Sequence, residues 1–337
     1  MINIAYIGNG KSANRYHIPF AQKVPGLVIK KIVSKSESKW EKIEGVEYVN
    51  ETRDVYEDDA IDLVVLSTPP HTHYELAKEA LTHGKHVLVE KPFSETVEEA
   101  KELFDLAEKK GLMIQCFQNR RFDSDFLTVQ KVIEEGKLGD LFEVEMHFDY
   151  FRPEVPKKTL AYSKPNSFVY THACHTLDQV ISYFGKPDDY QFDVRQLLGK
   201  GRMNDYFDLD LFYDTNLKVS VKSSYFRAKT RPSFVVYGKN GYFIKETKDR
   251  QEEHLKQFYM PTNNDFGLDL KEHYGTLIYY DEKGVYHEEK VISEVGDYSL
   301  FYQRLYETLT HGAPKLVKNE ETLLQIELLN EAVSHLK

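Results

Sequence analysis

The run Gly8-Asn9-Gly10-Lys11-Ser12-Ala13 constrains the fold most, because it directly follows an apolar segment of strand length, residues 2–7. Its G-x-G-x-x-A spacing is that of a dinucleotide-binding turn. The first glycine would permit a tight turn, the second would let backbone N–H groups approach a pyrophosphate, and the alanine would let a helix pack close to the strand. A second apolar run, residues 27–33, follows at the distance of a β-α-β unit. We therefore predict a parallel sheet with a nucleotide site near the N-terminus.

The residues after the second strand bear on the identity of the dinucleotide. An acidic residue there pairs with the ribose hydroxyls of NAD, whereas the 2'-phosphate of NADP is better met by cations and hydroxyls. This chain has Ser34-Lys35-Ser36 at that place. We expect NADP to be preferred, and NAD stays open because Glu37 and Glu41 follow closely.

Strand and helix signals alternate through the first third of the chain. Strand-like runs at 61–67, 86–90 and 112–117 are separated by helical patterns, and Thr96 to Glu99 forms a capping box that opens a helix ending before Gly111. Such alternation predicts an α/β domain, a doubly wound parallel sheet of Rossmann type.

The pattern changes beyond residue 119. Apolar and polar residues alternate strictly over 142–150, as in a strand with one covered and one wetter face. Similar strands follow near 205–213, 217–226, 233–237 and 276–280, and helical stretches at 298–310 and 320–336 end the chain. We expect a Rossmann domain over 1–118 and an α+β domain on an open, mostly antiparallel sheet over 119–337.

Composition excludes several classes of function. A chain of 337 residues exceeds the usual size of a single hydrophobic core, so we expect two domains. Its net charge of -10 argues against a nucleic-acid partner. It has no apolar run long enough to span a membrane and no signal peptide, so we expect a cytoplasmic protein. Two cysteines support neither a disulfide framework nor a cysteine zinc site.

Lys91 is the main candidate for chemistry. The strand at 86–90 runs into Glu90-Lys91-Pro92, and ligands of open α/β sheets bind at the carboxyl ends of the strands. A residue before proline is held extended, so Lys91 should stand up from the strand end as a proton-handling or substrate-orienting group. An isolated Lys-Pro is usually a solvated loop, but the nucleotide signals upstream favour the functional interpretation.

Five motifs in order resemble those of the Gfo/Idh/MocA oxidoreductase family: Gly8-x-Gly10-x-x-Ala13, His17-Ile18-Pro19, Ser67-Thr68-Pro69-Pro70 with His73, the Gly84 to Pro92 run and Asn119-Arg120-Arg121-Phe122. Residues 118–124 and 150–153 resemble most the branch with scyllo-inositol dehydrogenases. The resemblance implies a Rossmann domain followed by an open-sheet domain that often mediates oligomerisation. We accordingly expect a homo-oligomer, a dimer or a tetramer.

The resemblance also implies site residues. It places Lys91 beside the nicotinamide and the substrate hydroxyl. The family's D-x-G-x-H-like segment matches residues 170–179, where His175 fits the catalytic histidine but Thr171 stands at the aspartate position. His172 is a neighbour that can partly substitute for that aspartate.

The full prediction covers three groups of residues. The cofactor-binding set is Gly8, Asn9, Gly10, Lys11, Ser12, Ala13, Ser34, Lys35, Ser36, Ser67, Thr68, Pro69, His73, Glu90, Lys91, Pro92 and Gln118. The substrate-binding set is Arg120, Tyr150, Arg152, His172 and Asp178. Surface ion pairs are the alternative for the arginines, packing for the tyrosine, and a structural role for Asp178. Although His172 and His175 are spaced as a metal pair could be, no third ligand follows from the spacing, so we predict no metal.

Together with these residues, the resemblance implies an NAD(P)-dependent dehydrogenase acting on a cyclic polyol, sugar or sugar derivative. His175 would take the proton of a secondary alcohol while Lys91 polarises its oxygen. Two alternatives remain open: a cofactor-binding regulator without turnover, which Thr171 leaves possible, and reduction of a non-sugar carbonyl or imine.

Overall fold

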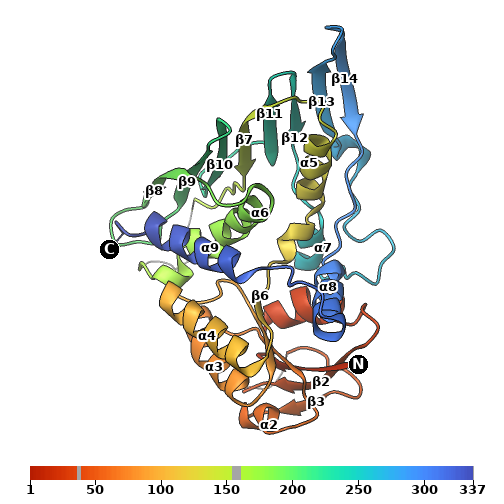
Figure 1. The fold of residues 1–337 in the computed structure, drawn as a ribbon, viewed down its shortest axis with the longest axis vertical. Coiled ribbons are helices and arrows are strands. Elements are labelled where there is room, and N and C mark those ends of the chain that lie inside the picture. Colours follow the sequence, from red (N-terminus) through yellow and green to blue (C-terminus); the bar gives the residue numbers. More distant parts are fainter. Residues whose placement is uncertain (36–38, 154–160, 337) are drawn as a thin grey trace. The chain divides into compact units, whose positions relative to one another are not determined.

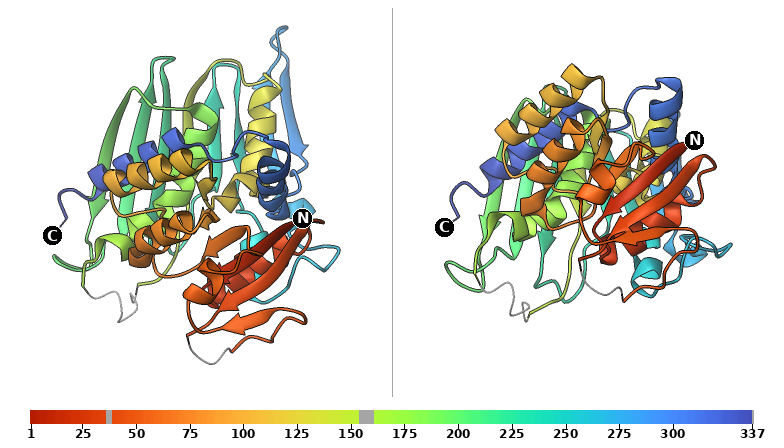
Figure 2. Two further views of the ribbon diagram at one scale, coloured as in Figure 1. Left: turned by 60° about the horizontal axis from the view of Figure 1, so that its bottom comes forward. Right: turned by 90° about the horizontal axis from the view of Figure 1, so that it is seen from below.

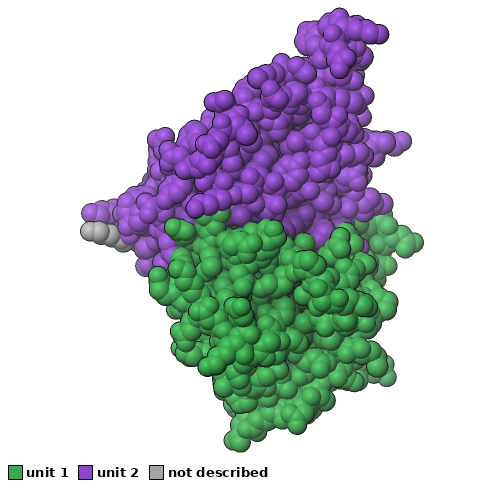
Figure 3. All heavy atoms as spheres, viewed as in Figure 1, with its two compact units in different colours: residues 1–119, 254–266, 298–327 green, residues 120–253, 267–297, 328–337 purple. Residues whose placement is uncertain are grey.

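The computed structural model describes residues 1–35, 39–153 and 161–336, which form two compact units (Figures 1 and 3). The first unit comprises residues 1–119, 254–266 and 298–327. The second comprises residues 120–253, 267–297 and 328–337. Each unit is built on its own sheet.

The sheet of the first unit is parallel, in the order β3-β2-β1-β4-β5-β6. Its strands are β1 (Ile2–Ile7), β2 (Leu27–Val33), β3 (Glu47–Val49), β4 (Leu63–Leu66), β5 (His86–Val89) and β6 (Ile114–Cys116). The side chains of β4 are all buried, as in a strand covered on both faces. The strand order reverses between β1 and β4, which is where such sheets bind ligands.

The helices of the first unit include the one predicted from the capping box at Thr96. They are α1 (Ile18–Ala21), α2 (Arg53–Tyr56), α3 (His73–Thr82), α4 (Val97–Lys110) and α8 (Ser299–His311). The capping box of α4 is present, because Thr96 Oγ1 accepts from the Glu99 N–H at 3.1 Å and the Glu99 carboxylate accepts from the Thr96 N–H at 3.2 Å. Gly111 ends α4 in a left-handed conformation with φ of 67°.

The second unit contains an eight-stranded sheet in the order β14-β13-β12-β11-β7-β10-β9-β8. Its strands are β7 (Leu141–His147), β8 (Asp189–Arg195), β9 (Tyr206–Tyr213), β10 (Leu217–Ser224), β11 (Phe234–Gly238), β12 (Gly241–Lys245), β13 (Gly275–Tyr280) and β14 (Tyr286–Val291). Among the described strands of this sheet, only β7 and β10 pair in parallel. The predicted class, an α/β fold with a parallel Rossmann sheet and a mostly antiparallel second sheet, is confirmed.

One face of this second sheet is covered by α5 (Ser124–Glu134) and α6 (Cys174–Phe184), as the ribbon views show (Figures 1 and 2). Val144 and Met146 of β7 are fully buried, whereas Glu143 and Glu145, which alternate with them, are half-buried on the opposite face. The regular strand predicted over 142–150 ends at His147. Beyond it, the Tyr150 N–H still donates to the Ser224 carbonyl at 2.9 Å.

The remaining helices join segments assigned to the two units. They are α7 (Gln251–Lys256) and α9 (Asn319–Ala332). Within the described ranges 1–35, 39–153 and 161–336, no helix combines the length and apolar character needed to cross a membrane.

Candidate functional site

The glycine loop after β1 is fixed by backbone contacts with the ends of neighbouring strands. Gly8 has a φ of 109°, and a Cβ at this position would lie 2.6 Å from the Ser67 carbonyl oxygen. The Ser67 hydroxyl donates to the Gly8 carbonyl at 3.0 Å, and the Gly8 N–H donates to Val33 at 3.2 Å. Only glycine fits this turn.

The rest of the loop fits a pyrophosphate. A Cβ built on Gly10 would meet nothing within 4 Å, so the backbone there faces open space. Ala13 is fully buried, Lys11 is exposed, and the Asn9 amide oxygen accepts from Asn14 at 2.8 Å. A π-helical segment, Ala13–His17, begins at the alanine and leads directly into α1. The loop therefore has a buried alanine where the helical segment begins and open space at Gly10, where a pyrophosphate could approach the backbone.

A buried polar network lies under this loop. The Glu90 carboxylate accepts from the Ser12 hydroxyl and from the Lys91 N–H at 2.9 Å, and it lies 3.0 Å from His17 Nε2. His17 Nδ1 lies 2.6 Å from the hydroxyl of Tyr302 on α8. Burial alone would raise the pKa of Glu90, but hydrogen bonding to His17 and the charges of His17 and Lys91 outweigh it and lower that pKa to about 2.

Two of these residues, His17 and Tyr302, are absent from the predicted site. His17 stood within the family-like motif His17-Ile18-Pro19, which was a signal that could have assigned it. Tyr302 gave no such signal, because it lies 285 residues from its partner.

The Lys91–Pro92 turn is tied to the loop after β4 by one histidine. The Lys91–Pro92 peptide bond is cis. His73 is fully buried, and its two ring nitrogens lie 2.8 Å from the Pro92 carbonyl and 3.0 Å from the Thr68 carbonyl. Burial lowers the pKa of His73. His73 therefore joins the Lys91–Pro92 turn to the loop after β4, and Lys91 itself is half-buried.

The other predicted cofactor residues of the first unit lie at strand ends. The Asn9 amide donates to the Ser34 hydroxyl at 3.5 Å, and Lys35 is exposed. Ser36 lies outside the described residues. Pro69 caps a short turn in which its carbonyl accepts from Thr72. Gln118 is buried after β6, and its Oε1 has no hydrogen-bond partner within residues 1–35, 39–153 and 161–336, as fits an acceptor for a ligand.

In the second unit, His175 lies in the first turn of α6. The preceding π-helical segment, Val169–Ala173, carries Thr171 and His172. The Thr171 hydroxyl donates to the Ser167 carbonyl at 2.8 Å and lies 2.9 Å from His172 Nδ1. The Thr171 hydroxyl, which we expect at the place of an aspartate, therefore bonds to groups of its own segment and the residues just before it. The Nδ1 atom of His175 is buried.

Aromatic rings gather around His172. Its ring lies 5.2 Å from that of Tyr150 and 4.5 Å from that of Phe168. The guanidinium of Arg152 lies 4.2 Å above Tyr150 and 5.7 Å from Tyr225. Three predicted substrate residues, Tyr150, Arg152 and His172, are thus brought together.

Arg120 and Asp178 lie in ion pairs. Arg120 pairs with Asp123 at 3.2 Å and with Glu252, and its guanidinium lies 5.0 Å from the Phe148 ring. Both Asp178 oxygens accept from buried Arg121, at 2.7 and 2.8 Å. This geometry favours the structural alternative for Asp178, since Arg121 already engages both of its oxygens.

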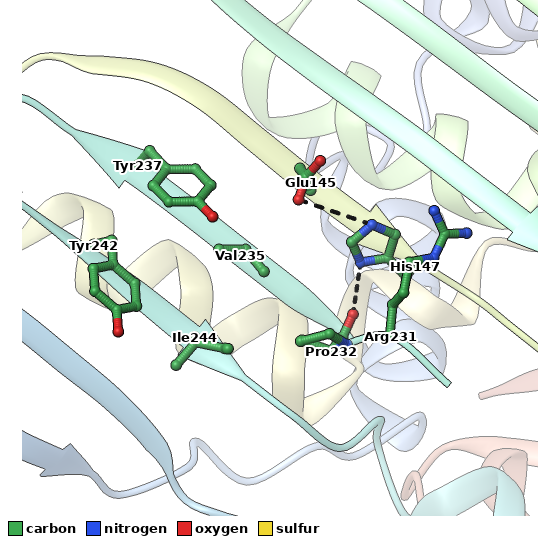
Figure 4. A pocket seen from close by; sticks show the side chains of 8 residues that line it. All are labelled: Glu145, His147, Arg231, Pro232, Val235, Tyr237, Tyr242 and Ile244. Atoms are coloured by element: carbon green, nitrogen blue, oxygen red, sulfur yellow. Dashed lines mark hydrogen bonds and ion pairs between the residues drawn. The ribbon is translucent and has the colours of Figure 1, made fainter. Parts of the chain in front are cut away.

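A shallow hollow of about 560 Å³ lies on the other face of the second sheet (Figure 4). It is lined by Glu145, His147, Arg231, Pro232, Val235, Tyr237, Tyr242 and Ile244. His147 is held there by a 2.8 Å hydrogen bond to the Pro232 carbonyl. None of the predicted site residues lines this hollow. In the part of the chain that the structure describes, no cluster of three or more His, Cys, Asp or Glu side chains could hold a metal ion.

Comparison with known families gives two matches that together span most of the chain. Residues 2–118 match the model of an oxidoreductase family with an NAD-binding Rossmann fold. Residues 130–335 match the model of the C-terminal α/β domain of the same oxidoreductase family.

Individual relatives are similar over the whole length. The uncharacterized oxidoreductase YhhX of Escherichia coli K12 is 43% identical, covering 98% of this chain and 95% of that protein. The scyllo-inositol 2-dehydrogenase (NADP(+)) IolW of Bacillus subtilis 168 is 31% identical, covering 100% of this chain and 94% of that protein. The crystal structure of an oxidoreductase from Bacillus cereus has a TM-score of 0.95 at 41% identity, covering 99% and 96% of the two chains.

Proposed function

Because the chain belongs to the Gfo/Idh/MocA oxidoreductase family and carries its NAD-binding domain, we propose that it oxidises a secondary alcohol of a cyclic polyol, sugar or sugar derivative. The observation that carries the proposal is the Glu90-Lys91-Pro92 corner, held by His17 and His73 beside the open glycine loop. Such a corner holds one lysine at the ligand-binding edge of the sheet.

In the proposed mechanism, a bound nicotinamide ring would accept a hydride from the alcohol carbon. Lys91 Nζ donates a hydrogen bond to the alcohol oxygen and stabilises the negative charge that develops on it. His175 takes the hydroxyl proton, and we assign this step to Nε2 because Nδ1 is buried. Tyr150, Arg152 and His172 would contact the ring hydroxyls of the substrate.

NADP is the preferred cofactor in this proposal. Ser34 and Lys35 follow β2 where NAD-selective sites carry an acidic residue, and IolW is named as an NADP(+) enzyme. Dissociation constants for NADPH and NADH test the preference. We expect the tighter binding for NADPH, and tighter binding of NADH would reject it.

A redox assay across a panel of inositols, sugars and sugar acids tests the function itself. We expect reduction of NADP+ with at least one cyclic polyol or sugar, with scyllo-inositol as the first compound because of the similarity to IolW. The competing proposal is a regulator, which Thr171 at the aspartate position keeps open. Tight cofactor binding without turnover on any compound, together with a captured protein partner, would favour the regulator.

The open face of the second sheet supports a further expectation, a homo-oligomer of two or four subunits. Light scattering of the purified protein measures its mass, and a monomeric mass would reject this expectation.

A further inference from the structure

Residues 254–266 are a detour of the chain into the first unit. The residues before and after them belong to the second unit. Phe266 anchors the detour, because its ring lies 5.9 Å from that of Phe20 on α1 and 5.6 Å from that of His254. The segment therefore packs against α1, the short helix that follows the glycine loop, although its flanking residues belong to the second unit.

The detour carries an exposed aromatic residue, Phe258, whose backbone conformation is unusual. Phe258 has a φ of 57°, which non-glycine residues rarely adopt, and is 45% exposed. Trp40 packs on it with ring centroids 5.4 Å apart, and the guanidinium of Arg15 lies 4.4 Å from the centroid of the same ring. We call these three residues the Arg15–Trp40–Phe258 cluster.

Two members of the cluster follow the glycine loop and β2, the elements that hold the adenosine end of a dinucleotide in Rossmann folds. Arg15 belongs to the π-helical segment that starts at Ala13, the last residue of the glycine loop. Trp40 follows β2 and Lys35 in the chain, and in Rossmann folds the end of the second strand faces the adenosine ribose. All three residues belong to the first unit.

Arg15 retains unused capacity to bind an anion. Its Nε is buried without a hydrogen-bond partner in the described residues, and no carboxylate in those same ranges forms an ion pair with it. The ring of Phe258 holds the guanidinium by a cation–π contact, which leaves its N–H donors for a ligand. A planar guanidinium of this kind matches the geometry of a phosphate.

We propose that Arg15 binds the 2'-phosphate of the cofactor's adenosine and that Phe258 and Trp40 form an aromatic surface for its adenine. This inference rests on the proposed use of NADP and assigns its specificity to a residue outside the Ser34-Lys35-Ser36 run. Phe258 positions the guanidinium, and the segment 254–266 brings this ring to the first unit.

Trp40 is the only tryptophan of the chain, so its fluorescence reports directly on the cluster. The probes are 2',5'-ADP and 5'-AMP, which share the adenine and differ in the 2'-phosphate. We expect both to quench Trp40, with 2',5'-ADP binding at least about tenfold more tightly because of its additional charge-assisted hydrogen bonds. A quench by neither probe, although NADPH binds in calorimetry, would overturn the inference and leave the proposed function standing.

Variants then assign the phosphate to Arg15. Arg15→Gln should raise the dissociation constant of 2',5'-ADP about tenfold and change that of 5'-AMP less than about threefold. Phe258→Ala should weaken both probes. The matched control is Arg53→Gln, which removes an exposed arginine of the same unit and should change neither constant.

The remaining outcomes separate the role proposed for Arg15 from the proposed function. Equal constants for 2',5'-ADP in Arg15→Gln and the wild-type chain, with melting curves that show both folded, would overturn the inference alone. Failure of the wild-type protein to bind 2',5'-ADP, NADPH and NADH would reject the proposed function as well. Should Arg15→Gln not fold, the comparison of the two probes on the wild-type chain and on Arg15→Lys decides the inference.

Discussion

At the scale of single residues, His147 shows how burial fixes a protonation state. Its Nδ1–H donates to the Pro232 carbonyl at 2.8 Å, a bond that the neutral and the protonated ring can both make, so burial decides the protonation state. Burial, assisted by the charge of Arg231, lowers its pKa from 6.5 to about 4. The unfolded chain therefore takes up a proton on His147 at a higher pH than the folded chain does.

This difference predicts a pH-dependent loss of stability. The contribution of neutral His147 is complete above pH 6.5 and is lost as the pH falls from 6.5 towards 4. Between about pH 7.5 and about pH 5, the free energy of unfolding of the wild-type chain should fall by about 2 kcal/mol more than that of His147→Asn. Urea titrations at both pH values measure this, and parallel losses in the two proteins would contradict it.

Tyr302 provides a second test at this scale, because its hydroxyl joins α8 to buried His17 in the network under the glycine loop. Tyr302→Phe removes the 2.6 Å contact with buried His17 Nδ1 and should lower the free energy of unfolding by about 1–2 kcal/mol. Tyr306→Phe on the same helix is the control, since no hydrogen bond to its hydroxyl occurs within the described ranges. Equal effects of the two substitutions on denaturant midpoints would count against the network.

At the scale of elements, the two loop glycines separate folding from binding. Gly8→Ala should destabilise the chain, because its Cβ would lie 2.6 Å from the Ser67 carbonyl at a φ of 109°. Gly10→Ala should leave the melting temperature unchanged, since its Cβ meets nothing within 4 Å, yet weaken NADPH binding at least about tenfold by occupying the space of the pyrophosphate. A Gly10→Ala protein that binds NADPH like the wild type would contradict the assigned role of the loop.

Elements with a clear apolar pattern were predictable, and edge strands were not. The buried run of β4 and the capping box of α4 are read directly from the sequence. In contrast, β14 reads Tyr-His-Glu-Glu-Lys-Val, without strict alternation, because it lies at an edge of the sheet where solvated charges are normal and the hydrophobic pattern of a strand is weak. The other edge strand, β8, reads Asp-Tyr-Gln-Phe-Asp-Val-Arg and does alternate, so its sequence held a signal that the prediction missed.

The same limit applies to the site. Lys91 and the glycine loop follow from local sequence, because strand ends and turns have local signatures. The partnership of His17 with Tyr302 and the packing of Trp40 on Phe258 depend on contacts between distant segments. Those pairings have no local signature, so they emerge only from the folded chain.

At the scale of the whole molecule, the chain returns twice to its first unit. Residues 298–327 supply the fully buried Tyr298, Phe301 and Tyr302 to this unit. We therefore predict that residues 1–119 alone do not fold cooperatively, whereas a version with 298–327 attached by a flexible linker regains a sharper thermal transition. A cooperative transition of the short fragment, followed by circular dichroism, would contradict this. That the chain divides into two domains at residues 118 and 119 stays a prediction.

The proposed mechanism assigns roles to Lys91, in the first unit, and to His175, in the second. Lys91→Ala and His175→Ala should each lower the turnover number at least about a hundredfold, while the dissociation constant of NADPH changes less than about threefold. Lys101→Ala, which removes an exposed lysine of α4, serves as the control.

The role of Lys91 is tested most directly by the single-turnover rate of NADP+ reduction with the best substrate of the panel, in wild type, Lys91→Ala and Lys101→Ala. We expect only Lys91→Ala to lose the rate while still binding the cofactor. A wild-type rate in Lys91→Ala would contradict it.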